Sequence, residues 1–378
     1  MKESPVLMLS FWNPTPAVPS KGVFIHDQFQ ALSKHGTNIF FIGVNVTHSK
    51  SLFKISTDES EIVSNKMITI NIQSIFWKFI YIFPFFVYAY LKSFLKRRSE
   101  GFRPAIVHSN IVFPCGFVGE RLAKYYKVPH LISEHWTQVH KIVNHPVFGR
   151  KARSVYQHSD MVICVSRFLT DQIRAINNAN NVCLVPNIVD TQLFCFHQKS
   201  RASKEFNFSC VASWRIPKRL DLIIDSLIDF ASIYTGKIIL RVIGDGEQVK
   251  HYKTVLLPQN LNIHWLGYLP KFKVAKVLAQ SDFFMHASEL ETFSIVTAEA
   301  LATGTPVLVS NIGALPELVC PNNGLLVENN KPAWVETLKQ ATSIAFDNEM
   351  IAQKIINKYS PDSVAENIES IYRKFTSA

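Results

Sequence analysis

The fold of this 378-residue chain is decided by the stretch Glu291-Thr-Phe-Ser-Ile-Val-Thr-Ala-Glu299-Ala-Leu-Ala-Thr-Gly304-Thr-Pro306-Val-Leu-Val309. Thr292 or Ser294 can cap a short helix, because a side-chain oxygen at that position accepts a hydrogen bond from the first helical amides. Gly304 supplies the left-handed residue that ends such a helix. Pro306 then opens a buried strand over Val307–Val309. The stretch therefore predicts a helix and a strand joined by a tight turn.

Two glutamates of this stretch are candidates for contact with a ligand. The start of a helix offers free amides and the positive end of its dipole, which suit a phosphate. Glu299 lies about one turn further on, where a carboxylate can accept two hydrogen bonds from a ribose diol, each contributing roughly 1.5–3 kcal/mol. On spacing alone, the simpler interpretation is a loop glutamate at Glu291 and a surface glutamate at Glu299.

Short apolar runs alternate with longer amphipathic segments, which is typical of βα units on a parallel sheet. The strands expected in the first half are Val6–Phe11, Asn38–Val44, Ala105–His108, His130–Ser133 and Met161–Val165. Those expected in the second half are Phe208–Ala212, Ile238–Ile243, Asn262–Trp265, Phe283–His286 and Pro306–Val309. Helices are expected between them, for example Ile25–His35, Gly116–Tyr126 and Leu220–Tyr234. The polar stretch Asp190–Lys204 separates the two sets, which predicts two Rossmann-like α/β domains.

The decisive stretch is similar to the E-x7-E motif of the retaining GT-B glycosyltransferases of family 4, the group 1 type. The match includes the phenylalanine after the first glutamate, the Glu-Ala after the gap and the Gly-Thr-Pro-Val that follows. Five other segments resemble motifs of that family in the same order: Val185-Pro-Asn187-Ile-Val-Asp190 with Phe194, Val242-Ile-Gly244-Asp245-Gly246-Glu247, Leu266-Gly267-Tyr-Leu, Gly313-Ala-Leu-Pro-Glu317 and Asn323-Gly324-Leu-Leu-Val. One such match is weak evidence, whereas six in order indicate the family.

The resemblance implies a GT-B fold, in which two Rossmann-like domains face each other across a cleft. Residues 1–188 would form the acceptor-side domain, and residues 189–358 the domain that binds the nucleotide sugar. A last helix over residues 359–378 would cross back to the first domain. The expected activity is transfer of a hexosyl-type sugar from a nucleotide-sugar donor.

Four residues of the decisive stretch take donor-binding roles by the same resemblance. Glu299 would bind the ribose hydroxyls, and Glu291 would contact the donor sugar as a catalytic residue. The backbone at Phe293 and Ser294 would approach the diphosphate or the sugar. The family often has Gly-Phe-Gly where this chain has Thr292-Phe-Ser, so we expect the sugar pocket to differ in shape.

The donor diphosphate needs cations, and the family places an arginine and a lysine at the start of the second domain. Lys218 aligns with that lysine, whereas the arginine position falls on Ser213. We expect Arg215 or Arg219 to take its place, since a guanidinium binds phosphate through two hydrogen bonds. The simpler interpretation is that these are solvated cations at a helix start.

Gly22 in the first domain resembles the family glycine that lets the backbone approach the diphosphate, although a lone glycine before a helix is commonly only a turn. No GxGxxG follows Val6–Phe11, which argues against a dinucleotide-dependent dehydrogenase.

His135 follows a buried strand, so its side chain is expected at the carboxyl end of the sheet. The segment Ser-Glu-His135-Trp resembles a family element whose histidine lies beside the donor sugar, and His135 is the second predicted catalytic residue. His108 and Asn110 end the preceding strand and either line the same edge or are structural. Ser166 is expected to cap a helix.

The expected mechanism is transfer with retention at the anomeric carbon and without an essential metal or cofactor, since no DxD triplet is present. Lys218, an arginine and helix amides would stabilise the departing nucleoside diphosphate. No residue can be named as a covalent nucleophile. The alternatives left open are another GT-B enzyme, such as a nucleotide-sugar epimerase or a phosphorylase, and a non-catalytic binding protein on this fold.

The net charge of +11 belongs to the first half of the chain. Residues 1–185 contain 21 Lys and Arg and 10 Asp and Glu, whereas residues 186–378 contain 19 of each kind. A basic surface attracts phosphates, nucleic acid or anionic lipid, or serves only solubility. No motif supports a nucleic-acid partner, so none is expected.

Ile75–Leu95 is dense in aromatic and aliphatic residues and is followed by three cations, Lys96–Arg98. Lys78 and Pro84 interrupt it, so a membrane span is a poor fit. It is either an interfacial helix on an anionic membrane or a helix, or helix pair broken near Pro84, packed inside the first domain. The first alternative makes a glycan or lipid-linked acceptor in surface polysaccharide or glycolipid synthesis plausible.

The remaining composition predicts a cytoplasmic protein that is peripheral at most. The start of the sequence lacks a basic region followed by a long apolar run, so no secretory signal is expected. The cysteines are scattered and form no CxxC pair, which fits a reducing compartment. They are Cys115, Cys164, Cys183, Cys195, Cys210 and Cys320.

Overall fold

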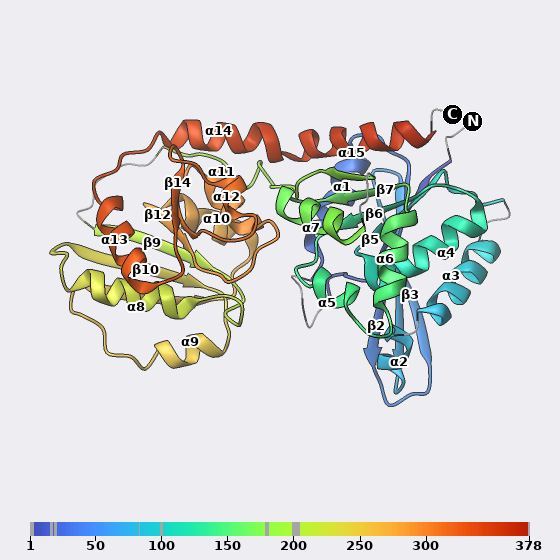
Figure 1. The fold of residues 1–378 in the computed structure, drawn as a ribbon, viewed down its shortest axis with the longest axis horizontal. Helices are drawn as coiled ribbons and strands as arrows, with labels where there is room; N and C mark the ends of the chain where they lie inside the picture. The colour runs from blue at the N-terminus through green and yellow to red at the C-terminus, as the bar shows by residue number, and fades with distance from the viewer. Residues whose placement is uncertain are drawn as a thin grey trace. The chain divides into compact units, whose positions relative to one another are not determined.

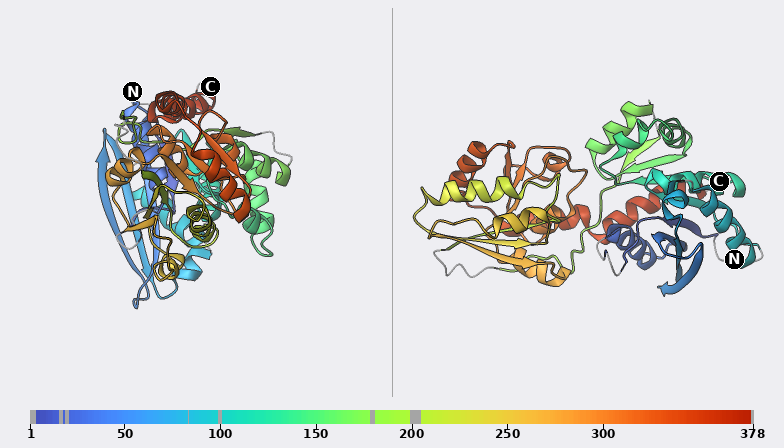
Figure 2. Two further views of the ribbon diagram at one scale, coloured as in Figure 1. Left: turned by 90° about the vertical axis from the view of Figure 1, so that its left-hand side faces the viewer. Right: turned by 90° about the horizontal axis from the view of Figure 1, so that it is seen from below.

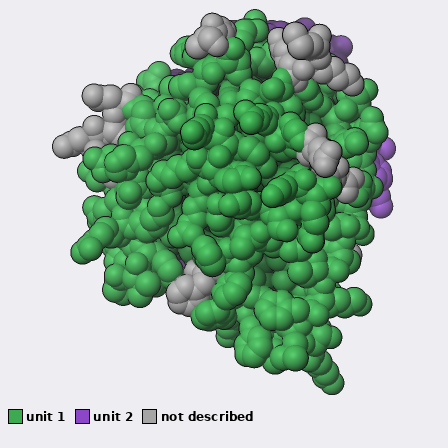
Figure 3. Space-filling model, turned by 90° about the vertical axis from the view of Figure 1, so that its right-hand side faces the viewer, with its two compact units in different colours: residues 1–188, 361–378 green, residues 189–360 purple. Residues whose placement is uncertain are grey.

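The computed structural model describes residues 4–15, 18, 21–82, 84–98, 101–177, 181–198 and 205–376. The chain forms two compact units, residues 1–188 with 361–378 and residues 189–360, which Figure 3 distinguishes by colour. Each unit is built on a largely parallel sheet flanked by helices (Figures 1 and 2). The predicted α/β fold class is therefore confirmed. Of the expected linker Asp190–Lys204, residues 199–204 lie outside the described residues.

Unit 1 contains an eight-stranded sheet with the order β3-β4-β2-β1-β5-β6-β7-β8. Its strands are β1 (Val6–Ser10), β2 (Ile39–His48), β3 (Lys54–Ile62), β4 (Asn65–Ser74), β5 (Ile106–Asn110), β6 (His130–Glu134), β7 (Met161–Cys164) and β8 (Val182–Leu184). All neighbours are parallel except β3 and β4. The five strands predicted in this half are present, with ends shifted by a few residues.

The central strands β1, β5 and β6 are buried on both faces, which explains why they read as continuous apolar runs. Val6 and Met8 of β1 join one core with the helices α1 (Val23–Lys34) and α15 (Pro361–Thr376). Leu7 and Leu9 join the other core with α2 (Trp77–Ile82), α3 (Phe85–Arg98) and α4 (Phe117–Tyr126). The remaining helical segments are η1 (Val112–Gly116), α5 (Val139–Val143), α6 (Gly149–His158) and α7 (Arg167–Asn177).

Ile75–Leu95 forms two helices rather than one. α2 ends at Ile82 and α3 begins at Phe85, on either side of Pro84; Phe83 lies outside the described residues. None of the helices described is both long enough and apolar enough to cross a membrane. The predicted break near Pro84 is therefore confirmed, and both helices contribute side chains to the unit 1 core.

Unit 2 contains a six-stranded parallel sheet with the order β11-β10-β9-β12-β13-β14. Its strands are β9 (Glu205–Val211), β10 (Lys237–Ile243), β11 (Leu261–Gly267), β12 (Phe283–His286), β13 (Val307–Ser310) and β14 (Gly324–Val327). Its helices are α8 (Leu220–Ala231), α9 (Glu247–Tyr252), α10 (Lys271–Ala279), α11 (Ile295–Ala302), α12 (Leu315–Leu318), α13 (Lys331–Ala341) and α14 (Asn348–Tyr359). The strand order reverses between β9 and β12, so these two strands mark the switch point where open α/β sheets bind ligands.

The decisive stretch forms the predicted helix, turn and strand, namely α11, Gly304 with a φ of 75°, and β13. The predicted side-chain cap is wrong. Ser294 does precede α11, but its φ of 68° is left-handed and its side chain makes no capping bond. Its hydroxyl instead lies 2.8 Å from the Thr297 hydroxyl. The side chain therefore does not cover the first amides of α11.

The expected last helix over residues 359–378 is present as α15 (Pro361–Thr376), which belongs to unit 1 and is preceded by the separate helix α14. α14 ends at Tyr359 and packs on α11 in unit 2. α15 begins at Pro361 and packs on α1 in unit 1. Ser360 between them is extended, which fits the preference of a residue before proline for extended backbone.

Candidate functional site

Two loops meet at the carboxyl end of the unit 2 sheet, beside the switch point. One follows β9 and leads to Lys218, and the other follows β12 and leads to Glu291. The amide of Glu289 donates to the carbonyl oxygen of Pro217 at 2.9 Å, which joins the loops. The structure thus brings two of the predicted donor-site residues together.

Glu291 is the centre of this site. Its carboxylate forms an ion pair with the Lys218 ammonium. Nε2 of His286 lies 2.6 Å from the same oxygen, Oε1, and therefore donates to it. The side chains of Glu291 and His286 are almost entirely buried, whereas Lys218 is partly exposed.

The charges of the site follow from these contacts. Burial alone disfavours the carboxylate, but the Lys218 ammonium and the His286 bond outweigh it and lower the pKa of Glu291 to about 2. Burial and the Lys218 charge lower the pKa of His286, against the pull of Glu291. At neutral pH Glu291 is therefore a carboxylate and His286 a neutral imidazole. Such a carboxylate accepts hydrogen bonds from hydroxyl groups, and the ammonium attracts phosphate.

The sequence did not single out His286, which ends β12 five residues before Glu291. Its Nδ1 is buried and has no hydrogen-bond partner in the part of the chain that the structure describes. The usable signal was its position, because a histidine at the carboxyl end of a strand beside the switch point faces the ligand edge.

Two side chains, Trp214 and Gln248, hold the backbone of the loop that carries Lys218. Trp214 is fully buried, and its Nε1 donates to the carbonyl oxygen of Ile243 at 2.9 Å. Gln248 donates to the carbonyl oxygen of Lys218 at 2.7 Å and accepts from the amide of Leu220 at 2.8 Å. The loop is therefore fixed through its backbone, which leaves the Lys218 side chain to respond to ligands.

The two candidate arginines have different surroundings. Arg219 is held by Asp221, with nitrogen–oxygen distances of 2.7 to 3.0 Å, and by Glu289 at 3.3 Å. Arg215 is exposed and forms no ion pair with any described residue. Of the two, Arg215 is the one whose guanidinium is available to a phosphate.

The other predicted donor residues lie on and before α11. Glu299 is half-buried on this helix. The ring of Phe293 packs against Tyr359 of α14 at 5.6 Å between centroids, so only its backbone faces the loop. The carbonyl oxygen of Glu291 accepts from the amide of Ala314 at 3.1 Å. A Cβ on Gly313 would lie 2.2 Å from that oxygen, which explains the glycine of the Gly-Ala-Leu-Pro-Glu segment.

His135 lies in unit 1, immediately after β6. Its Nδ1 is 3.0 Å from the side-chain amide oxygen Oδ1 of Asn187, so Nδ1 carries the proton and donates to Oδ1, and Nε2 is the accepting nitrogen. Burial lowers the pKa of His135 to about 4 although the bond to Asn187 opposes the shift. The buried Glu134 carboxylate accepts from the amides of His135 and Trp136, each at 3.0 Å, and thereby fixes this turn.

Gly22 has a left-handed φ of 67°, and a Cβ there would lie 2.0 Å from the carbonyl oxygen of Trp12. Internal packing therefore accounts for this glycine. The start of α1 does lie near His135, because the rings of Phe24 and His135 are 4.5 Å apart. The structure thus brings the two predicted unit 1 residues to one neighbourhood.

Three other residues have structural roles. Both ring nitrogens of His108 are bonded, Nδ1 to the Tyr372 hydroxyl at 2.6 Å and Nε2 to Ser133 at 2.8 Å. Asn110 donates to the carbonyl oxygen of Leu9 at 3.1 Å. Ser166 accepts from the amide of Leu169 at 3.1 Å, which confirms the predicted cap.

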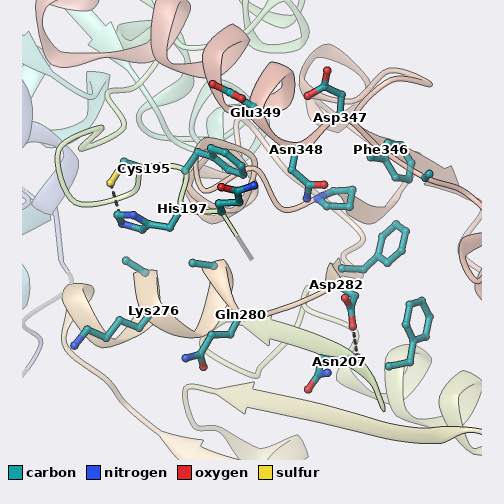
Figure 4. A pocket seen from close by; sticks show the side chains of 18 of the residues that line it. Cys195, His197, Asn207, Lys276, Gln280, Asp282, Phe346, Asp347, Asn348 and Glu349 are labelled. Atoms are coloured by element: carbon teal, nitrogen blue, oxygen red, sulfur yellow. Dashed lines mark hydrogen bonds between the residues drawn. The ribbon is translucent and has the colours of Figure 1, made fainter. Parts of the chain in front are cut away.

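A cavity of about 1110 Å³ lies at the opposite, amino end of the unit 2 sheet (Figure 4). It is lined by the first residues of β9, by Asp282 and by the segment before α14. None of the predicted site residues lines it. Among the residues described, no three His, Cys, Asp or Glu side chains are placed to hold a metal ion.

The known proteins that this chain resembles are glycosyltransferases. The family described as "Glycosyltransferase Family 4" matches residues 22–193, and "Glycosyl transferases group 1" matches residues 194–371. The chain is 27% identical over 282 residues to an uncharacterized glycosyltransferase of Methanocaldococcus jannaschii, covering 74% of the chain and 72% of the relative. It is 26% identical over 192 residues, 49% of each protein, to a GDP-mannose-dependent α-(1-6)-phosphatidylinositol dimannoside mannosyltransferase of Mycobacterium tuberculosis.

Among solved structures, sucrose-phosphate synthase from Thermosynechococcus elongatus has a TM-score of 0.75 at 16% identity, covering 99% of this chain and 100% of that one. A likeness at this identity supports the fold. Together the fold and the family matches define the class, a hexosyl-transferring enzyme on the GT-B fold. The chain belongs to glycosyltransferase family 4, the group 1 type, as its motifs indicated.

Proposed function

We propose that this enzyme transfers a sugar, with retention and without a metal, from a nucleotide sugar to a glycan or lipid-linked acceptor in surface polysaccharide or glycolipid synthesis. The observation that carries the proposal is the Lys218–Glu291 pair at the switch point of unit 2. It joins a cation suited to a diphosphate with a carboxylate suited to sugar hydroxyls. The mycobacterial relative, named for GDP-mannose and a phosphatidylinositol mannoside, supports both substrate classes.

The proposed donor contacts follow from the charges in unit 2. Lys218, Arg215 and the uncapped amides at the start of α11 neutralise the diphosphate. Glu299 binds the ribose hydroxyls, and the backbone at Phe293 and Ser294 approaches the sugar. In the ligand-free chain Lys218 is paired with Glu291, so an arriving diphosphate competes with that carboxylate for the ammonium.

The proposed role of His135 follows from its protonation state. With a pKa of about 4 the ring is neutral at physiological pH, and its accepting nitrogen is Nε2. A neutral imidazole suits a hydrogen bond from a sugar hydroxyl, but it carries no charge to assist departure of the phosphate. We therefore assign positioning of the sugar, rather than acid catalysis, to His135.

The test is a panel of UDP, GDP and ADP sugars with glycan and lipid-linked acceptors, followed by proton NMR of the anomeric centre. We expect nucleoside diphosphate release, a product with the donor's anomeric configuration, and unchanged rates in a chelator. An inverted product, or loss of activity on chelation that is restored by a divalent ion, contradicts the mechanism. Epimerised free nucleotide sugar in place of a glycoside would indicate the alternative enzyme class.

A further inference from the structure

The helices α2 and α3, together with Phe76 just before α2, expose four aromatic rings. Phe76, Phe79, Phe85 and Phe86 are each between 49% and 55% exposed. The rings of Phe79 and Phe86 lie 5.8 Å apart, so the two helices contribute to one continuous surface. We call these four residues the aromatic surface. Exposed apolar patches on soluble units commonly mark sites of interaction.

Packing inside unit 1 does not account for these rings. The same helices already bury a separate set of side chains against the sheet, namely Ile80, Val87, Leu91 and Leu95. Three of these follow the four-residue spacing of a helix face. The core contribution of the helices is therefore complete without the aromatic surface.

Cations lie on the helices that carry the aromatic surface and on the neighbouring α4. The segment from Ile75 to Arg98 contains five Lys and Arg and no Asp or Glu. The Arg121 guanidinium of α4 lies over the Phe85 ring at 5.2 Å, and the Lys92 ammonium of α3 lies over the Tyr125 ring at 4.2 Å. The aromatic surface is therefore accompanied by positive charge, which complements an anionic headgroup layer and would not complement a basic partner.

We propose that the aromatic surface docks onto an anionic lipid bilayer. Aromatic rings favour the headgroup region, and each Lys or Arg near an anionic leaflet adds to the attraction. α2 and α3 would lie in the plane of the interface, because neither helix is long enough to cross it. The inference rests on the proposed function only in supplying a reason for docking, namely a lipid-linked acceptor.

The test is sedimentation of the full chain with phosphatidylcholine vesicles that contain about 30% phosphatidylglycerol, which makes their surface anionic, and with vesicles of phosphatidylcholine alone. We expect binding to the anionic vesicles that weakens as salt is raised, and little binding to the neutral ones. The double variant Phe79→Ser/Phe86→Ser should lose at least about tenfold in partitioning, roughly 1.4 kcal/mol. Both residues are exposed, so the variant should keep the thermal melting curve of the parent chain.

The control is the double variant Leu256→Ser/Phe272→Ser, which removes two exposed apolar side chains from unit 2 and should bind vesicles like the parent. The proposal is overturned if the parent does not sediment with anionic vesicles at low salt, or if the Phe79/Phe86 variant binds them as well as the parent does. Concentration-dependent dimers abolished by that variant, without vesicle binding, would identify a second copy as the occupant. Donor-induced thermal shifts, measured in parallel without lipid, separate failure of docking from failure of the proposed function.

Discussion

Gly313 is the residue on which the backbone position of Glu291 depends. Its φ of 54° is left-handed, and a Cβ there would lie 2.2 Å from the Glu291 carbonyl oxygen. The next amide, Ala314, donates to that oxygen. A side chain at position 313 must therefore displace the Glu291 backbone and the carboxylate that it carries.

We expect Gly313→Ala to lower the free energy of unfolding by more than the ~1–2 kcal/mol of left-handed strain alone, and to weaken donor binding. Gly36→Ala is the control, because Gly36 also has a positive φ but open space around its Cβ position. Urea unfolding and donor titration of both variants measure the difference. Equal destabilisation with normal donor binding would show that the contact with Glu291 is unimportant.

His108 should make unit 1 sensitive to acid. Burial, with the neighbouring His135 and His130, lowers the pKa of His108 to about 3. Between this value and the ordinary pKa of about 6.5, His108 is protonated in the unfolded chain but not in the folded chain. The free energy of unfolding therefore falls as the pH drops below about 6.5 and stops falling near pH 3. At pH 5 His108 should have lowered the free energy of unfolding by about 2 kcal/mol.

The measurement is urea unfolding of the parent and of His108→Gln between pH 7 and 5. The variant should be less stable at pH 7, because it loses the bonds to Tyr372 and Ser133, but its stability should depend less steeply on pH. Parallel curves for the two proteins would contradict the assignment of His108 as a buried neutral group.

At the residue scale, the sequence predicted the members of the site better than their contacts. The motif resemblance placed Lys218 and Glu291 in one site, but their ion pair depends on two loops whose geometry no local pattern encodes. His286 was missed because a histidine at a strand end is most often structural. The cap at Ser294 was mispredicted because residue type does not reveal a left-handed backbone.

At the scale of elements, the side chain of Gln248 holds the loop that carries Lys218 through two hydrogen bonds to its backbone. We expect Gln248→Ala to weaken donor binding about tenfold with a small change in melting temperature, because it frees the loop backbone without opening the core. Gln353→Ala is the matched control, since Gln353 is an exposed glutamine on α14. Calorimetric titration of the donor into both variants measures the effect. A normal affinity for Gln248→Ala would show that the loop does not need this support.

The β3–β4 hairpin and the short strand β8 are absent from the elements that the sequence predicted. β3 is exposed along almost its whole length, so it has no apolar alternation to detect. The turn residues Val63 and Ser64 both have positive φ, as in a type I′ turn. They are not the Asn-Gly pair from which such a turn is predicted in a sequence. β4 was detectable, because its Ile68, Ile70 and Ile72 alternate and are buried.

At the scale of the whole molecule, unit 1 is assembled from both ends of the chain. α15 contributes Val364, Ala365, Ile368, Ile371 and Tyr372 to a core that also contains β1. The core of unit 1 therefore includes residues that follow unit 2 in the sequence.

We expect Ile368→Asp to abolish the cooperative unfolding transition of unit 1 and to leave that of unit 2 in place, because an unpaired buried charge costs several kcal/mol. Glu366→Asp, on the exposed face of α15, should leave both transitions unchanged. Scanning calorimetry resolves the two cases. Loss of both transitions in the Ile368 variant would show that the units do not unfold independently.

The central claim is that unit 2 binds a nucleotide-sugar donor through Lys218 and Glu299. Isothermal titration of UDP, GDP and ADP sugars into the parent, Lys218→Gln, Glu299→Gln and Lys237→Gln tests it most directly. We expect nucleotide sugars of at least one base to bind the parent, and the Lys218 and Glu299 variants to bind them at least about tenfold more weakly. Lys237→Gln, altered at the amino end of β10, should bind them normally. Absence of binding to the parent, or equal affinity in all four proteins, would contradict it.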